Sequence, residues 1–244
     1  MNSYVLTNYL IVGFFTVIQI SCGSSIFESA EKEDVAANAA VLLEEGKGQE
    51  AADLLQAELE NDPTNYTLVS LLASAQAMII GVDEVRVALK LANPDSSEST
   101  TGTSSSSNEV SLLFDAVPAG TSENIQGLDT ALTTLQSIPA ASRTNGDQFK
   151  LTLYFTARLS LVTKSFDTDG DGQVSPIEIL DLDATDATSI LATLDNAAAA
   201  IASAGDDEGS AAAAAAIAGI QSDIANQEGN TDEERLQNYL GSAE

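Results

Sequence analysis

The stretch that decides the fold is residues 37–65, which read ANAAVLLEEGKGQEAADLLQAELENDPTN. Apolar and small residues recur here at steps of three and four on both sides of a Gly-Lys-Gly break at 46–48. Such spacing places them on one face of a helix, and Leu55 and Leu59 mark that face in a helix expected over 49–61. An Asp-Pro pair follows, where a helix cannot readily continue. The stretch therefore predicts two short antiparallel helices that pack face to face.

The same hairpin resembles a tetratricopeptide repeat (TPR), a pair of antiparallel helices of about 34 residues. When Pro63 is aligned with the terminal Pro of that repeat, Gly46 falls on the glycine between the helices and Ala51 on the small position of the second helix. Residues 66–94 repeat the theme, and residues 122–138 resemble a further second helix. The resemblance implies hairpins stacked in a TPR-like array. The alternative is a generic helical hairpin with an Asp-Pro stop.

The remainder of the chain also has helical patterning, so the predicted fold class is all-α. Pro is rare and aromatic residues make up only 5% of the chain, a balance typical of helices with small-residue packing. Further helices are expected over about 25–45, 67–80, 83–92, 109–116, 122–137, 147–166, 186–202, 210–227 and 232–240. One of them is expected to be amphipathic, with an apolar stripe of Leu151, Phe155, Leu159, Val162 and Phe166.

A Ser/Thr-rich run, NPDSSESTTGTSSSSN, occupies residues 93–108 and contains almost no apolar side chain. Such a segment cannot bury enough surface to offset the entropy of ordering it. The expected organisation is therefore TPR-like hairpins within 22–94, a linker or long loop over 95–109, and a second helical region over 110–244.

The charge balance excludes several classes of function. The chain carries 37 Asp and Glu against 9 Lys and Arg, a formal net charge of -28. No nucleic acid partner is expected, because phosphate binding needs clustered cations. The absence of His and the single Cys exclude Ser-His-Asp and Cys-His catalytic systems and ordinary zinc sites within this chain. The sequence predicts a protein that is not an enzyme.

The N-terminal segment indicates export. Residues 5–20, VLTNYLIVGFFTVIQI, are mostly apolar but fewer than the roughly 20 that a membrane-spanning helix needs, and a signal peptide is expected over 1–21. The stretch IQISC, which ends at Cys22, resembles the lipobox of bacterial lipoproteins. That resemblance implies a lipid anchor on Cys22 and, with Gly23 next, an outer-membrane lipoprotein facing the periplasm or the cell surface. The alternatives are a cleaved signal peptide with an incidental Cys and an uncleaved signal anchor.

Residues 167–178, DTDGDGQVSPIE, carry the strongest chemical motif. Acidic side chains stand at the first three odd positions, Gly stands sixth and Glu twelfth, which is the pattern of the EF-hand calcium loop. The carboxylates converge because the chain coils around the ion, and the closing Glu binds through both oxygens. The expected Ca²⁺ ligands are Asp167, Asp169, Asp171, Glu178, the backbone carbonyl of Gln173 and, directly or through water, Ser175.

Val174 is expected to anchor this loop in the core, and a solvated acidic turn is the alternative. No second loop is found, because residues 181–186 lack the Gly and the closing Glu. We interpret that stretch as a helix break with Asp186 as the N-cap. A single loop outside the cytoplasm favours a constitutive structural Ca²⁺, since extracellular sites have dissociation constants on the order of 10⁻⁴–10⁻³ M.

These features predict a non-enzymatic scaffold or adaptor of the cell envelope, stabilised by Ca²⁺, that binds a protein partner through its helical surface. A second hypothesis is a solute-binding accessory lipoprotein, similar to the TPR component of TRAP-type transporters. A third is an acidic structural surface protein. An enclosed apolar cavity with a few polar groups would favour the solute-binding hypothesis, whereas an open apolar groove would favour the scaffold.

The lipid anchor is tested by intact-mass analysis of membrane-purified protein. The mass is expected to lack residues 1–21 and to include at least two acyl chains on Cys22, since one chain alone gives only marginal anchoring. Retention of Met1, or a soluble product with a free Cys22 thiol, would contradict the lipoprotein interpretation.

Overall fold

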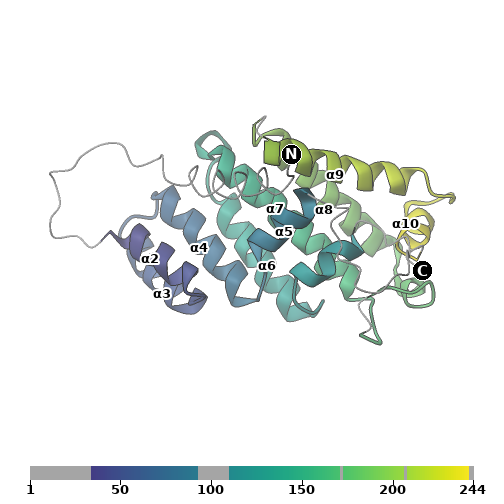
Figure 1. The fold of residues 1–244 in the computed structure, drawn as a ribbon, viewed down its shortest axis with the longest axis horizontal. Coiled ribbons are helices and arrows are strands. Elements are labelled where there is room, and N and C mark those ends of the chain that lie inside the picture. Colours follow the sequence, from purple (N-terminus) through teal and green to yellow (C-terminus); the bar gives the residue numbers. More distant parts are fainter. Residues whose placement is uncertain (1–33, 93–109, 171–172, 206–207, 242–244) are drawn as a thin grey trace, which may run out of the picture. The chain divides into compact units, whose positions relative to one another are not determined.

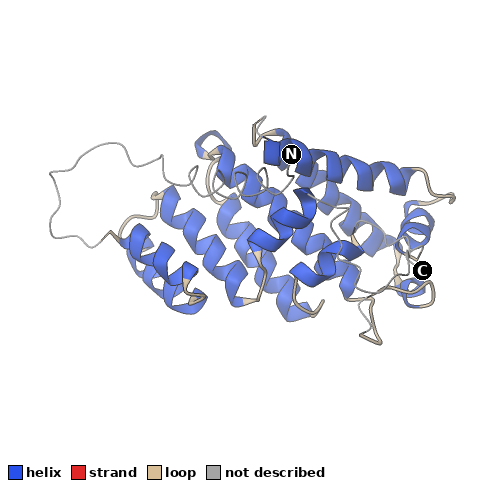
Figure 2. Cartoon of the chain, viewed as in Figure 1, coloured by secondary structure: helices blue, strands red, loops and turns tan. Residues whose placement is uncertain are grey.

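The structure is a computed structural model that describes residues 34–92, 110–170, 173–205 and 208–241. These residues form α-helices and 3-10 helices and contain no β-strand, which confirms the all-α fold class (Figure 1, Figure 2). The α-helices are α2 (Val35–Glu44), α3 (Gly48–Leu59), α4 (Tyr66–Ile79), α5 (Glu84–Ala92), α6 (Ser122–Gln136), α7 (Asn145–Lys164), α8 (Ala184–Ala202), α9 (Glu208–Ala225) and α10 (Asp232–Leu240). The 3-10 helices are η1 (Ser111–Ala116), η2 (Ala140–Ser142) and η3 (Glu178–Asp181).

The helix limits agree closely with the sequence-based expectation. Helices α3 to α10 begin and end within two residues of the predicted limits, and α2 ends at Glu44. The predicted start of α2, the signal peptide, Cys22 and the 95–109 linker lie outside the described residues. One expectation was wrong: the segment 109–116 forms the 3-10 helix η1 and not an α-helix. The backbone of Val117 is extended because Pro118 disfavours the helical conformation in the residue before it.

The first hairpin closes as the Gly-Lys-Gly sequence predicted. Gly46 has a φ of 74°, the left-handed conformation that Gly adopts most readily. Its N–H donates to the carbonyl of Leu43 at 3.0 Å, and the N–H of Lys47 donates to that of Leu42 at 2.8 Å. This pair of bonds satisfies the last carbonyls of α2 and reverses the chain into α3.

Small side chains allow α3 to pack between α2 and α4. Ala51 is fully buried, in agreement with its assignment to a small contact position. The apolar cluster between these helices consists of Ala39, Ala51, Ala52, Leu55, Leu68, Leu72 and Ala75. A methyl group at such positions brings helix backbones close together at little entropic cost.

Helix α7 forms the centre of the described fold, and α5, α6, α8 and η1 all pack against it. The seven consecutive residues 151–157 are buried. Seven residues cover nearly two helical turns, so α7 presents no solvent face along this stretch. Leu151, Phe155 and Leu159 are buried as expected, but the amphipathic character predicted for this helix was wrong.

The apparent polar face of α7 is a buried row of hydroxyl groups. Thr152, Thr156 and Ser160 are at most 2% exposed. Each hydroxyl donates to the carbonyl four residues earlier on α7, at 3.1, 2.8 and 3.1 Å. Because the helix itself satisfies these hydroxyls, they can face neighbouring helices without the cost of an unpaired buried polar group.

Two lysines of α7 connect it to distant parts of the chain through backbone acceptors. The amine of Lys150 donates to the carbonyl of Ser70 on α4 at 3.0 Å. The amine of Lys164 donates to the carbonyl of Phe114 at 3.0 Å, so it holds η1 against the end of α7. These two cations therefore act as internal helix connectors.

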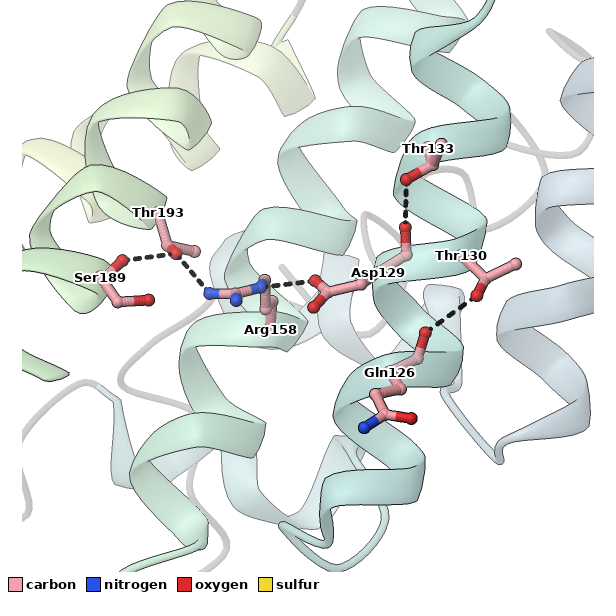
Figure 3. Close-up of polar contacts among 7 residues, drawn as sticks. All are labelled: Gln126, Asp129, Thr130, Thr133, Arg158, Ser189 and Thr193. Carbon is pink, nitrogen blue, oxygen red and sulfur yellow. Dashed lines mark hydrogen bonds and ion pairs between the residues drawn. The ribbon is translucent and has the colours of Figure 1, made fainter. Parts of the chain in front are cut away.

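Arg158 makes the most extensive polar contact between helices (Figure 3). Its Nε lies 2.6 Å from Asp129 Oδ1 on α6, and its Nη1 donates to Thr193 Oγ1 on α8 at 2.8 Å. The hydroxyl of Thr193 in turn donates to the carbonyl of Ser189 at 2.8 Å. One side chain thus links three helices.

We expect Arg158→Ala to lower the free energy of unfolding by about 1–3 kcal/mol, because it leaves the Asp129 carboxylate and the Thr193 hydroxyl without a donor. Urea denaturation measures the change. Arg235→Ala is the control, since Arg235 pairs with the exposed Asp232 of its own helix and its loss should cost less than about 0.5 kcal/mol. Equal effects of the two substitutions would show that the three-helix contact adds no stability.

Candidate metal centre

The acidic loop 167–178 leads from α7 into η3. The N–H of Asp167 donates to the carbonyl of Lys164 at 3.2 Å, which ties the loop to the last turn of α7. Val174, Ile179 and Leu182 are at most 4% exposed. The expected burial of Val174 is therefore confirmed, and buried side chains anchor the second half of the loop.

Glu178 joins the two halves of the loop. Its Oε1 accepts from the N–H of Thr168 at 2.7 Å, from the Thr168 hydroxyl at 2.8 Å and from the N–H of Asp169 at 3.2 Å. Its Oε2 accepts from the N–H and the hydroxyl of Ser175 at 3.0 and 2.9 Å. The Glu178 carboxylate therefore connects the last position of the loop to its second, third and ninth positions, which are Thr168, Asp169 and Ser175.

Three carboxylates converge at this point. Asp167, Asp169 and Glu178 each offer an oxygen within 4.8 Å of the other two. Oxygen ligands of one Ca²⁺ stand at most about 5 Å apart, twice the metal–oxygen distance of about 2.5 Å. The group therefore has the spacing and the donor type of a site for a hard divalent cation.

The turn that brings these groups together depends on Gly170. Its φ is 76°, in the left-handed region, and its N–H donates to Asp167 Oδ1 at 2.8 Å. A residue with a Cβ is strained in this conformation. The Gly thus lets the chain reverse between the first two acidic positions and the rest of the loop.

The donors around Glu178 stabilise its charged form. They lower the pKa of its carboxyl from 4.5 to about 2, and the largest cause is the hydrogen bond from the backbone N–H of Ser175, followed by that from the Thr168 hydroxyl. Hydrogen bonds to a carboxylate favour ionisation. The Glu178 carboxyl is therefore ionised at pH values well above 2.

The other predicted ligands have different outcomes. Asp171 lies outside the described residues. Gln173 is exposed within the loop, and its expected role as a carbonyl ligand stays a prediction. Ser175 lies at the cluster, where it bonds Glu178. The structure thus brings together Asp167, Asp169, Glu178 and Ser175.

Sequence analysis did not identify Thr168, which gives Glu178 two of its five hydrogen bonds. It also overlooked that Ser175 and Glu178 form a reciprocal pair, in which the N–H of Glu178 donates back to the Ser175 hydroxyl at 3.4 Å. The spacing Ser-x-x-Glu with Pro176 after the Ser is the signal that could have revealed it, since this is the pattern of a capping box with Pro at the first helical position.

The start of α8 corrects one assignment. Asp186 was expected to be the N-cap, but Asp183 has that position and accepts from the N–H groups of Thr185 and Asp186 at 2.7 and 2.9 Å. Asp186 stands three residues later and completes a capping box. The sequence alone allowed either Asp183 or Asp186 to be the N-cap. In the capping box, Asp183 is the N-cap and Asp186 bonds back to it from the third helical position.

No single helix in the described parts of the chain is long and apolar enough to cross a membrane. By length and composition alone, one pair bent by 90°, α4 with α5, passes the same test. No protein-family model, curated protein or solved structure matches the chain.

The pKa of Glu178 gives a testable pH dependence. Because its pKa is lower in the folded chain, the stability it contributes is present above pH 4.5 and is lost as the pH falls toward 2. The advantage of the wild-type chain over Glu178→Gln in unfolding free energy should therefore shrink between pH 5 and about pH 2, measured by urea denaturation in chelator. A carboxyl NMR titration that places the pKa of Glu178 near 4.5 would contradict this description of the loop.

Proposed function

We propose that this protein is a non-enzymatic helical scaffold of the cell envelope, that Ca²⁺ in the 167–178 loop stabilises it, and that its helices bind a protein partner. The observation that carries the proposal is the convergence of Asp167, Asp169 and Glu178 within 4.8 Å. All three belong to a loop whose sequence has the EF-hand spacing.

The electrostatic environment supports a bound cation. Residues 165–234 contain 16 acidic side chains and neither Lys nor Arg. The nearest preceding cation, Lys164, donates to carbonyl groups of Phe114 and Val117. Because this stretch of the sequence supplies no positive side chain, a bound cation would relieve repulsion between the loop carboxylates.

The choice of Ca²⁺ follows from the ligands. Carboxylate, carbonyl and hydroxyl oxygens are hard donors. Mg²⁺ requires shorter bonds and a near-octahedral arrangement and retains several waters, whereas Ca²⁺ accepts six to eight oxygens in a flexible geometry. A 12-residue loop with a bidentate Glu suits the larger ion.

The location of the loop explains why the ion would be structural. It joins α7, the central helix, to the segment that leads into α8, and these two helices pack along each other. A cation that holds Asp167 and Asp169 to Glu178 therefore fixes the connection between two core helices. With a single loop, we propose a permanent ion and not a sensor.

The scaffold function rests on the architecture. Helices α2, α3 and α4 pack in succession, and α4 then packs against α6. This succession is compatible with the first predicted hairpin, but α4 and α5 meet at 90° and α5 packs against α7, α9 and η1, so residues 66–94 do not form the second antiparallel hairpin. We therefore propose a helical surface built on α2, α3, α4 and α6, with stacking as in helical repeats. The lipid anchor on Cys22 and the export signal are part of the same proposal, because Ca²⁺ outside the cytoplasm suits a loop of moderate affinity.

The calcium site is tested by thermal unfolding of metal-free protein. Millimolar Ca²⁺ should raise the melting temperature, because an ion that binds only the folded chain stabilises it by about 0.4 kcal/mol at a concentration equal to its dissociation constant and by about 1.4 kcal/mol at ten times that concentration. Chelator should reverse the rise, and Mg²⁺ should produce much less of it.

Two matched substitutions locate the effect. Glu178→Gln should remove most of the calcium-dependent rise, because it removes the bidentate ligand. Asp183→Asn removes the same charge five residues away, keeps a side-chain oxygen for the α8 N-cap and should leave the rise intact. Each rise is measured against the variant's own metal-free curve. If the two substitutions change the calcium-dependent rise equally, or if calcium does not change the melting temperature of the wild-type chain, the loop is only an acidic turn.

A further inference from the structure

An exposed apolar pair lies at the end of the acidic loop, with Ile177 inside it and Leu180 two residues after it. Ile177 is 81% exposed and Leu180 is 68% exposed. The other large apolar side chains that the described residues expose are Val41, Ile79, Val85 and Leu89. Ile177 and Leu180 stand on either side of the Glu178–Ile179 pair, and we refer to them as the loop-exit patch.

The geometry of η3 points the two side chains of the patch the same way. In a 3-10 helix the side chains of residues three apart eclipse each other, and Ile177 precedes Leu180 by three at the start of η3. Ile179 and Leu182, which are also three residues apart, are buried in the core at 1% exposure each. The turn therefore has an inner apolar side that anchors it and an outer apolar side that solvent reaches.

The C-terminal helix α10 supports this turn from behind. Gln237 Nε2 donates to the carbonyl of Leu182 at 3.1 Å. Gly241 lies so close to the turn that a Cβ there would be 3.2 Å from Pro176 Cα. A surface that is held in place before binding loses little entropy on binding, and these contacts of α10 on both sides of the patch favour binding in this way.

The charge around the patch defines its partner. The patch belongs to the 165–234 stretch, which has 16 acids and no cation. Asp181 and Asp183, both exposed, follow Leu180 directly. The cation that closes this stretch, Arg235, pairs with Asp232 of its own helix. Charge complementarity therefore requires positive charge on whatever covers Ile177 and Leu180.

We propose that the loop-exit patch docks a basic amphipathic helical segment of a partner protein. Apolar side chains of that segment cover Ile177 and Leu180, and its Lys or Arg side chains face the surrounding carboxylates. This inference rests on the proposed scaffold function and names the surface and the partner class for it. Because Ile179, Leu182 and α10 hold the turn, the patch does not need the calcium ion.

The test uses the full mature chain and a labelled 14-residue Leu/Lys amphipathic peptide, with binding followed by fluorescence anisotropy. Ile177→Ser combined with Leu180→Ser should weaken binding at least tenfold. Val85→Ser is the matched control, since Val85 is 67% exposed on α5, next to Arg86; it should leave binding within twofold. A peptide with Glu in place of Lys should not bind.

Several results would overturn the inference. Equal binding by the wild-type chain and the double variant would mean that the peptide binds the acidic surface through charge alone and not through Ile177 and Leu180. Association of the chain with itself, or binding to zwitterionic vesicles, that disappears in the double variant would assign the patch to a second copy or to a membrane. Calorimetric Ca²⁺ titration of the same samples separates the two claims: a chain that binds Ca²⁺ but not the peptide refutes only the docking surface, and the opposite result refutes only the calcium site.

Discussion

The burial of α7 is the constraint on which the rest of the described structure depends. Residues 151–157 have no solvent face, so every neighbouring helix must fit against them. The hydroxyls of Thr152, Thr156 and Ser160 bond carbonyls of α7 itself, which lets polar residues occupy the core without unpaired groups. The acidic loop begins three residues after α7 ends at Lys164, and its first residue, Asp167, bonds the last turn of that helix.

Three of the nine cations of the chain connect α7 to its neighbours. Lys150, Arg158 and Lys164 all belong to α7 and bind groups on α4, α6, α8 and η1. Residues 165–234 contain no Lys or Arg, and Arg235, the first cation after them, pairs with Asp232. The chain thereby combines a core whose helices are connected by these cations with an acidic C-terminal region, for which we propose a metal ion at the loop and a basic partner at the loop-exit patch.

The sequence was sufficient for much of this structure. Apolar periodicity and helix-terminating residues, such as Gly46 after α2, predicted nearly every helix limit. The loop motif predicted that the carboxylates of Asp167, Asp169 and Glu178 would lie close together. Periodicity failed for α7, because a Thr/Ser row has the same pattern whether it faces water or bonds its own helix. It could not choose between Asp183 and Asp186, since both residues suit an N-cap. Contacts such as Arg158 with Asp129 and Thr193 join residues far apart in the chain, and local patterns do not encode them.

The central claim is that one specific cation site lies in the 167–178 loop of a very acidic chain. Calorimetric titration of metal-free protein with Ca²⁺ in about 0.15 M salt, which screens weak surface binding, measures it most directly. The account predicts one Ca²⁺ per chain, with the heat of binding abolished by Glu178→Gln. Absence of binding at millimolar Ca²⁺, or many weak equivalent sites that the substitution does not change, would contradict it.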